Sequence, residues 1–458
     1  MSDYLPQETL VDIFTRLPIK TLLQIRCVCK TWYALINSPI FITAHINRTI
    51  ANTTTPLLLL RYHSRYGRVE EHYSVHCDDE TFDERLTLDC AKDCYRIVGS
   101  CNGLICLSDD LFAMSVAEFT NVIILWNPAI QKSVRLPMPR FTDDSHGLLR
   151  FVLAFGFDSR TNDYKVVRIV HLHNSFDFVV PPEVDVYELS TGVWRSSGSA
   201  APPYYANVGH WSHVFVNGAS HWVAFECLGV YGFKQNRNLI LSFDMGSEVF
   251  KEMILPDSVA NGRKLNLSIA LFGESLSVFH YDDGYWSTSK SCCIWVMKEY
   301  GVEGSWTKLF TVDLGGINKV LGFRKTGEVL VEKSDGELVS YDPNSEEEVE
   351  TGIRSCQSSL HLDTYMESLV LLGGKNEVLM GRECNSNAFT ENFGEEDGVK
   401  EADNVNVLRN IWTSCLDFCC FYPWIDEMRL TLLCIDLKTQ LCITACFIQQ
   451  KLLPLLSM

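Results

Sequence analysis

Apolar positions near the N-terminus recur at helical spacing. Four of them stand at i, i+3, i+4 and i+7 and place one stripe along a helix: Leu10, Ile13, Phe14 and Leu17. Pro6 fits the first position of this helix, where its missing N–H costs nothing, and Pro18 is expected to end it.

Two further short helices are expected before residue 40. The second begins near Thr21, and the third covers residues 30–36 and stops at the Ser38-Pro39 pair. Three short helices cannot bury much surface alone. We call residues 4–48 the head. A segment this small and this apolar is expected to leave one apolar face exposed for a partner protein.

From Pro56 to about residue 405 the helical period gives way to short apolar runs separated by Gly, Asn and Asp turns. The runs repeat, and one aromatic residue marks each unit: Trp126, Tyr187, Phe243, Trp295 and Tyr341. The intervals between these marks are 61, 56, 52 and 46 residues. Units of about 40–50 residues with four strands each predict propeller blades, in which neighbours cover one another's apolar faces.

A sixth unit is needed to join the two ends of the ring. We expect strands at 57–62 and 84–88 to pair with a strand near 366–374, which removes exposed strand edges. Four tryptophans are interpreted as core between blades: Trp194, Trp222, Trp295 and Trp306.

Charge and cysteine content narrow the class of protein. The chain has 39 basic and 57 acidic residues, a net charge of −18, which argues against non-specific nucleic-acid binding. The N-terminus is polar, and no run reaches the roughly 18 apolar residues of a membrane span. The 18 cysteines are interpreted as reduced, mostly buried thiols. We expect a cytoplasmic or nuclear protein that binds neither nucleic acid nor membrane.

Catalytic motifs are absent. The sequence holds no phosphate-binding loop, dinucleotide fingerprint, nucleophile elbow, zinc-protease helix or C-x-x-C pair. The one suggestive group, which could gather imidazoles at a metal, is His171, His173, His210, His213 and His221. The favoured interpretation is that these are ordinary histidines of strands and loops. We therefore assign no catalytic residue, cofactor or metal, and expect catalysis to belong to partners.

The head resembles an F-box. The run LPQETLVDIFTRLPIKTLLQIRCVCKTWYALINSPIF has the family's Leu-Pro start, its Arg-Leu-Pro between helices, its Val-Cys-Lys-x-Trp and its Ser-Pro-x-Phe end. This resemblance implies docking on a Skp-family adaptor, which joins the chain to the cullin and RING subunits of a ubiquitin ligase. It also implies a set of adaptor contacts: Leu5, Pro6, Leu10, Ile13, Leu17, Pro18, Leu22, Val28 and Trp32. The alternative is that these side chains pack together as the head's own core.

The region of repeated strands that follows the head resembles the F-box-associated, kelch-like domain of plant F-box proteins. The phrases CNGLICL, LWNPAIQKSVRLP, AFGFDSRTNDYKVVRI, VYELSTGVWRS and YMESLVLL follow one another as in that family. The resemblance implies a mainly β fold, a kelch-like β-propeller of about six blades preceded by a small three-helix F-box. It implies a substrate-recognition subunit of an SCF ubiquitin ligase that delivers a target for degradation. Two alternatives stay open, a non-degradative scaffold or decoy and an S-locus-type receptor for a basic secreted ribonuclease.

Four segments are expected along the chain. They are an F-box at 1–48, the propeller at 49–382, an acidic flexible linker at 383–404 and a Cys-rich apolar tail of unknown role at 405–458. The residues that contact the target are not identified by the sequence.

Overall fold

The computed structural model describes most of the chain up to residue 372. The described residues are 6–52, 57–64, 71–88, 95–109, 121–146, 149–172, 182–202, 205–206, 213–228, 235–261, 267–281, 291–313, 315–356 and 358–372. All of them belong to one unit, Met1–Glu383. The predicted linker at 383–404 and tail at 405–458 lie outside them.

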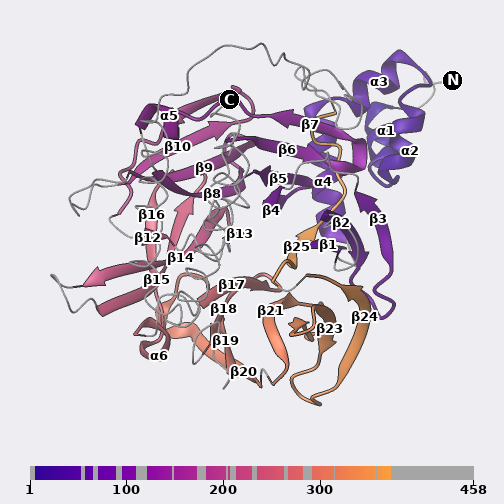
Figure 1. The fold of residues 1–458 in the computed structure, drawn as a ribbon. Coiled ribbons are helices and arrows are strands. Elements are labelled where there is room, and N and C mark those ends of the chain that lie inside the picture. The colour runs from indigo at the N-terminus through magenta and orange to yellow at the C-terminus, as the bar shows by residue number, and fades with distance from the viewer. Residues whose placement is uncertain are drawn as a thin grey trace, which may run out of the picture. The chain divides into compact units, whose positions relative to one another are not determined.

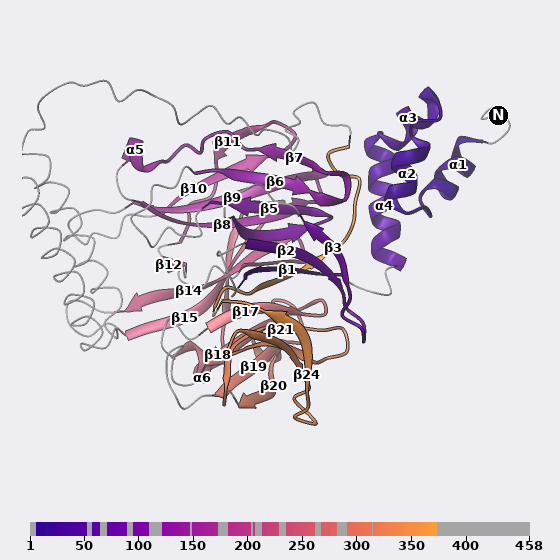
Figure 2. The ribbon, with the colours of Figure 1, turned by 45° about the vertical axis from the view of Figure 1, so that its right-hand side comes forward.

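The head extends to Asn52 and contains four helices, α1 (Gln7–Phe14), α2 (Ile19–Ile25), α3 (Lys30–Ile36) and α4 (Pro39–Asn52). They form the indigo group in Figure 2. The third helix has the predicted bounds. The first ends at Phe14, earlier than expected, and Pro18 precedes α2 as its N-cap instead of closing α1.

The fourth helix was not predicted, so the expectation of a three-helix head was wrong. The Ser38-Pro39 pair was interpreted as a stop, but it starts α4. The Ser38 hydroxyl accepts a hydrogen bond from the Phe41 N–H at 3.2 Å, and Pro39 takes the first helical position, where no N–H is required.

The rest of the described chain folds into six antiparallel sheets, which are the blades of a propeller (Figure 1). This confirms the predicted mainly β fold and its six blades. Neighbouring innermost strands contact one another around a complete ring in the order β25, β4, β8, β13, β17, β21 and back to β25. The sheets of β4–β7 and β8–β11 pack against each other through one shared apolar core.

Blades are numbered here along the chain. Blade 1 contains β25 (His361–Tyr365), β1 (Leu57–His63), β2 (Glu71–Cys77) and β3 (Glu84–Leu88). Blade 2 contains β4 (Arg96–Cys101), β5 (Leu104–Ser108), β6 (Ile123–Asn127) and β7 (Lys132–Arg135), with the turn η3 (Pro128–Ile130) between the last two. Blade 3 contains β8 (Leu149–Asp158), β9 (Asp163–Leu172), β10 (Glu183–Glu188) and β11 (Val193–Ser196), preceded by α5 (Asp143–His146).

The other three blades follow the same plan, except that blade 4 has a fifth, two-residue strand. Blade 4 contains β12 (Tyr205–Ala206), β13 (His213–Val216), β14 (Ala219–Leu228), β15 (Gln235–Asp244) and β16 (Phe250–Ile254), followed by α6 (Asp257–Ala260). Blade 5 contains β17 (Leu267–Phe272), β18 (Ser275–Tyr281), β19 (Ser291–Met297) and β20 (Trp306–Asp313), with η4 (Glu303–Ser305) before the last. Blade 6 contains β21 (Ile317–Phe323), β22 (Val329–Lys333), β23 (Glu337–Tyr341) and β24 (Glu348–Arg354).

As predicted, a strand from late in the chain closes the ring by joining blade 1, but it is not the strand that was expected. The innermost strand of blade 1 is β25, which pairs with β1 from Leu57↔Tyr365 to Arg61↔His361. The prediction that residues 366–374 form this strand was wrong, because 366–372 have no strand structure. Closure by the C-terminal strand joins the ends of the ring and leaves β1 no free inner edge.

The aromatic marks occupy equivalent positions. Counted from the innermost strand, each lies on the third strand of its blade, namely β6, β10, β15, β19 and β23; in blade 4 the count starts at β13 and leaves out the two-residue β12. Tryptophans also connect blades as predicted. The indole N–H of Trp222 donates to the Leu153 carbonyl of blade 3 at 3.1 Å, and that of Trp306 to the Ile254 carbonyl of blade 4 at 3.0 Å.

Two further expectations can be compared with the described residues. The eight cysteines whose side chains the structure describes are free thiols, in keeping with the interpretation as reduced side chains. Among the helices of this part of the chain, none is long and apolar enough to cross a membrane.

Candidate functional site

The predicted head residues divide between the interior and the surface. Leu10 and Leu22 are buried in the head's core, with Leu22 fully inaccessible. Leu17 and Trp32 are half-buried against that core. Leu5 lies outside the described residues. The remaining predicted contacts are exposed: Pro6, Ile13, Pro18 and Val28.

Trp32 belongs mainly to the head's own packing. Its ring meets Phe14 edge-to-face, with centroids 5.0 Å apart and planes at 80°. The sequence left open whether Trp32 serves an interface or the core, and this contact favours the core.

The head exposes more apolar surface than sequence reasoning identified. Of the thirteen large apolar side chains exposed in the described residues, five lie in the head. Ile13 and Val28 were predicted, and their exposed fractions are 42% and 65%. Tyr33, Ile40 and Ile50 were missed. Ile40 and Ile50 lie on α4, and they were missed because this helix was not predicted. The Ser38-Pro39 pair, which starts the helix, was the sequence signal that could have identified them.

A segment from the other end of the chain completes the head's core. Residues 366–372, called the strap below, follow β25 directly. Leu369 and Leu372 pack with Leu10, Phe14 and Leu22 of the helices. Other strap side chains pack into the core of blades 2 and 3, where α4 also contributes Ile46: Met366, Val370 and Leu371. The strap therefore belongs to both cores and joins the head to the ring.

Blade 2 holds the strap by its backbone. The buried amide of Asn127 donates to the carbonyls of Ser368 at 3.0 Å and Val370 at 2.8 Å. The Lys132 ammonium donates to the Leu372 carbonyl at 3.1 Å. In the β4–β5 turn, Gly103 has φ +82° and lies so close to Ser368 that a Cβ there would be 2.3 Å from the serine hydroxyl. The sequence runs CNGLICL and LWNPAI thus contain residues that contact the strap, namely Gly103 and Asn127.

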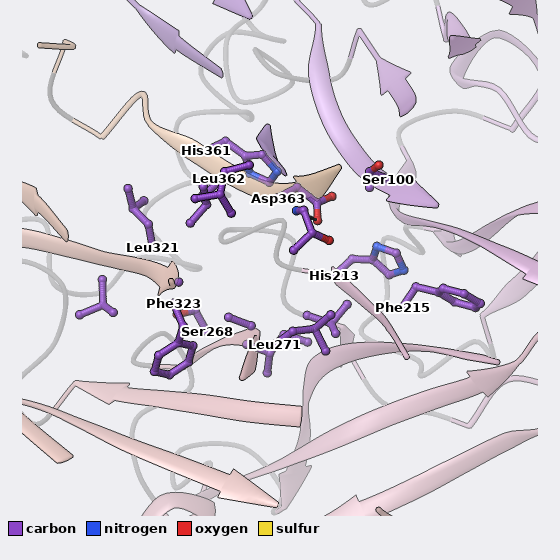
Figure 3. A pocket seen from close by; sticks show the side chains of 18 of the residues that line it. Ser100, His213, Phe215, Ser268, Leu271, Leu321, Phe323, His361, Leu362 and Asp363 are labelled. Atoms are coloured by element: carbon purple, nitrogen blue, oxygen red, sulfur yellow. Dashed lines mark hydrogen bonds between the residues drawn. The ribbon is translucent and has the colours of Figure 1, made fainter. Parts of the chain in front are cut away.

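The six innermost strands form a ring around the central channel of the propeller. Figure 3 shows a pocket that lies among them. A cavity of about 120 Å³ lies there, lined by residues of β4, β13, β17, β21 and β25 together with Leu58 of β1. His361 and Asp363 reach it from β25, His213 lies beside them, and Ser268 and Phe323 lie across from them (Figure 3).

Burial controls the charge of the titratable groups in the channel. It lowers the pKa of His213 and of His361 to about 3 each, so both imidazoles are neutral at pH 7. Burial raises the pKa of the Asp363 carboxyl to about 7, although hydrogen bonds from the backbone N–H groups of Thr364 and Ser100 act to lower this pKa. Near neutral pH this carboxyl is therefore only partly ionised.

The described histidines of the sequence's suggestive group do not meet at one point. His213 bonds through Nδ1 with the Val98 carbonyl and through Nε2 with the Ser220 hydroxyl. His221 bonds with the Val214 carbonyl and the Tyr300 hydroxyl. In the described part of the chain no three His, Cys, Asp or Glu side chains gather as metal ligands. His173 and His210 lie outside it.

Comparison with known proteins identifies both parts. A family profile described as the F-box associated beta propeller domain matches residues 65–371, and an F-box-like profile matches residues 2–48. F-box protein CPR1 of Arabidopsis thaliana is 29% identical over 439 residues, which cover 89% of this chain and 95% of CPR1. An F-box/kelch-repeat protein of the same plant is 28% identical over 318 residues, which cover 67% of this chain and 79% of that protein.

Proposed function

Because the chain belongs to the family of F-box proteins with an F-box-associated β-propeller, we propose that it recruits one target protein to an SCF ubiquitin ligase for degradation. In this family's general arrangement the F-box binds a Skp-family adaptor, and the propeller serves as the receptor. The adaptor brings the cullin and RING subunits, and ubiquitin transfer is carried out by those partners. We place the protein in the cytoplasm, the nucleus or both.

The observation that carries this proposal is the exposed apolar surface of the head. Ile13 lies in the last turn of α1 and Val28 lies in the turn between α2 and α3, and both side chains are exposed. Apolar anchors on short helices suit a hydrophobic groove on a partner's helices. Pro6, Pro18 and the half-buried Leu17 are proposed to extend the contact, whereas Leu10 and Leu22 support it from the core.

Co-expression of the full chain with a Skp-family adaptor, followed by size-exclusion chromatography, tests the adaptor contact. The wild-type chain is expected to elute as a stable one-to-one complex. Ile13→Asp with Val28→Asp is expected to abolish the complex, because each carboxylate would be desolvated at the interface without a partner. Val193→Asp is the matched control, since Val193 is 55% exposed on the outer strand of blade 3. Equal binding by both variants would contradict the assigned surface.

Degradation requires a separate measurement. Proteins captured by the full chain are assayed for ubiquitination by the reconstituted ligase and for half-life with and without proteasome inhibition. A target stabilised by the inhibitor, and by the Ile13→Asp/Val28→Asp variant, supports the receptor role. A captured protein whose half-life is unchanged by the inhibitor and by the variant favours the scaffold or decoy role. A basic ribonuclease among the captured proteins is the result that the S-locus alternative requires.

A further inference from the structure

The central channel holds polar groups that the protein itself leaves without partners. The Ser268 hydroxyl on β17 is buried, with 6% of the residue exposed, and has no hydrogen-bond partner in the described structure. Nε2 of His361 on β25 is likewise buried and unpartnered among the described residues. Both residues line the same cavity (Figure 3). Because an unpaired buried polar group is destabilising, a molecule in the cavity would bind more tightly by forming hydrogen bonds with these two groups.

Positive side chains lie around the cavity. Lys319 on β21 lines it and stands opposite Glu332 of β22 in the strand register. Burial raises the pKa of the Glu332 carboxyl, although the charge of Lys319 acts to lower it, and this reduces the negative charge of Glu332. Besides burial, the charges of Lys319, Arg61 and Arg96 contribute to the lowered pKa of His361. Arg61 is neutralised by its ion pair with Glu71. The one carboxyl of the lining is Asp363, whose raised pKa reduces its negative charge.

The size of the cavity restricts the occupant. A volume of about 120 Å³ admits a molecule of a few non-hydrogen atoms and excludes a folded segment of a target protein. The lining also has apolar walls, including Leu271 and Phe323, opposite the imidazoles (Figure 3). A small, singly charged ligand with several hydrogen-bond acceptors fits this combination.

We propose that the central channel binds a small free oxyanion, a phosphate or a short carboxylate, whose charge is neutralised by Lys319 and whose oxygens pair with Ser268 and His361. This site is separate from the head and does not depend on the proposed ligase role.

Isothermal titration calorimetry of the full chain tests the proposal, with inorganic phosphate and acetate as probes and chloride at equal ionic strength as the blank. One saturable site for at least one probe is expected. Lys319→Met should weaken binding about tenfold or more, since it removes a charge-assisted hydrogen bond. Lys308→Met is the matched control, because Lys308 is exposed on the outer strand of blade 5 and should leave affinity unchanged.

Two further variants separate binding from a structural effect. Ser268→Ala removes only an unpartnered hydroxyl and should weaken binding while the far-ultraviolet circular dichroism is kept. Asp363→Asn should strengthen binding, because it removes the one negative charge of the lining. Absence of any saturable site in the wild type, or equal affinities of Lys319→Met and Lys308→Met, would overturn the proposal and leave the channel occupied by water. Complex formation with the adaptor is measured in parallel and is expected to be the same for both lysine variants.

Discussion

The side-chain amide of Asn127 donates a hydrogen bond to the carbonyl of Val370, 243 positions later in the chain, at 2.8 Å. The same amide donates to the Ser368 carbonyl. Asn127 ends β6 and is fully buried. One side chain of blade 2 thus fixes the strap, and the strap in turn supplies Leu369 to the core of the head.

Asn127→Ala is expected to destabilise the protein by about 2–4 kcal/mol, since it leaves two buried carbonyl groups without a donor. Urea unfolding followed by tryptophan fluorescence measures the loss. Asn344→Ala is the control, because Asn344 lies exposed in the β23–β24 turn and should cost less than about 0.5 kcal/mol. Similar losses for the two variants would show that the strap contact is not a stabilising one.

Leu369→Asp is expected to disrupt the head while the blades stay folded. The buried, unpaired carboxylate would cost more than about 3 kcal/mol within a core made mostly of α1–α3. Hydrogen exchange should show lost protection in these helices and retained protection in β4–β7, and adaptor binding should fall. Leu86→Asp, at an exposed position on β3, is the control. If Leu369→Asp left the helices protected, the head would be stable without the strap.

The sequence predicted the repeat but not the way in which its ends meet the head. The aromatic marks identified the third strand of five blades because a ring recurs there in each of these units, buried in four of them and half-buried for Trp295. The apolar run around Leu369 was interpreted as a strand because short apolar runs in sheets and in irregular core segments have the same composition. Its role follows only from contacts across the whole chain, such as those of Asn127, which no local pattern contains.

The candidate head surface was predicted in part for a related reason. A stripe at helical spacing identifies apolar residues, but the same stripe serves a core or an interface. Ile13 proved exposed and Leu10 buried, although they are three residues apart on α1. Which side of the stripe faces outward depends on α4 and the strap, and neither was expected to lie there. The channel site had no sequence signal, since Lys319 and His361 meet only when the ring closes.

The protein is expected to lose stability on mild acidification. Burial lowers the pKa of six described histidines, to about 4 for His171 and His221 and to about 3 for His213 and His361. The other two are His45 and His76. Histidine in the unfolded chain has a pKa near 6.5. Below that pH the unfolded state binds protons that the folded state does not, so the free energy of unfolding falls as the pH drops from about 6.5 towards 4. Asp363 opposes this trend, because its raised pKa favours the folded state at low pH.

Urea unfolding at pH 7.0, 6.0 and 5.0 measures this dependence. His221→Asn should make the slope shallower by about one proton, because His221 is fully buried. His146→Asn, on the exposed end of α5, is the control. A free energy of unfolding that rises from pH 7 to pH 5 would contradict the assignment of these histidines as neutral.

Lys165 is expected to be the most costly lysine to remove. It lies on β9, and its ammonium bonds with Asp158 and Glu248 at 2.9 Å each and with the Met245 carbonyl at 2.8 Å, which joins blade 3 to blade 4. Asp158 is fully buried, so Lys165→Met removes its ammonium partner, leaves its carboxylate to the Arg160 N–H and the mostly exposed Arg160 guanidinium, 3.8 Å away, and should cost about 3–5 kcal/mol. Adding Asp158→Asn should restore part of the loss, which a double-mutant cycle measures. Lys333→Met removes an exposed pair with Glu348 and should cost at most about 1 kcal/mol. Equal costs for the two lysines would mean that the buried network contributes nothing beyond a surface ion pair.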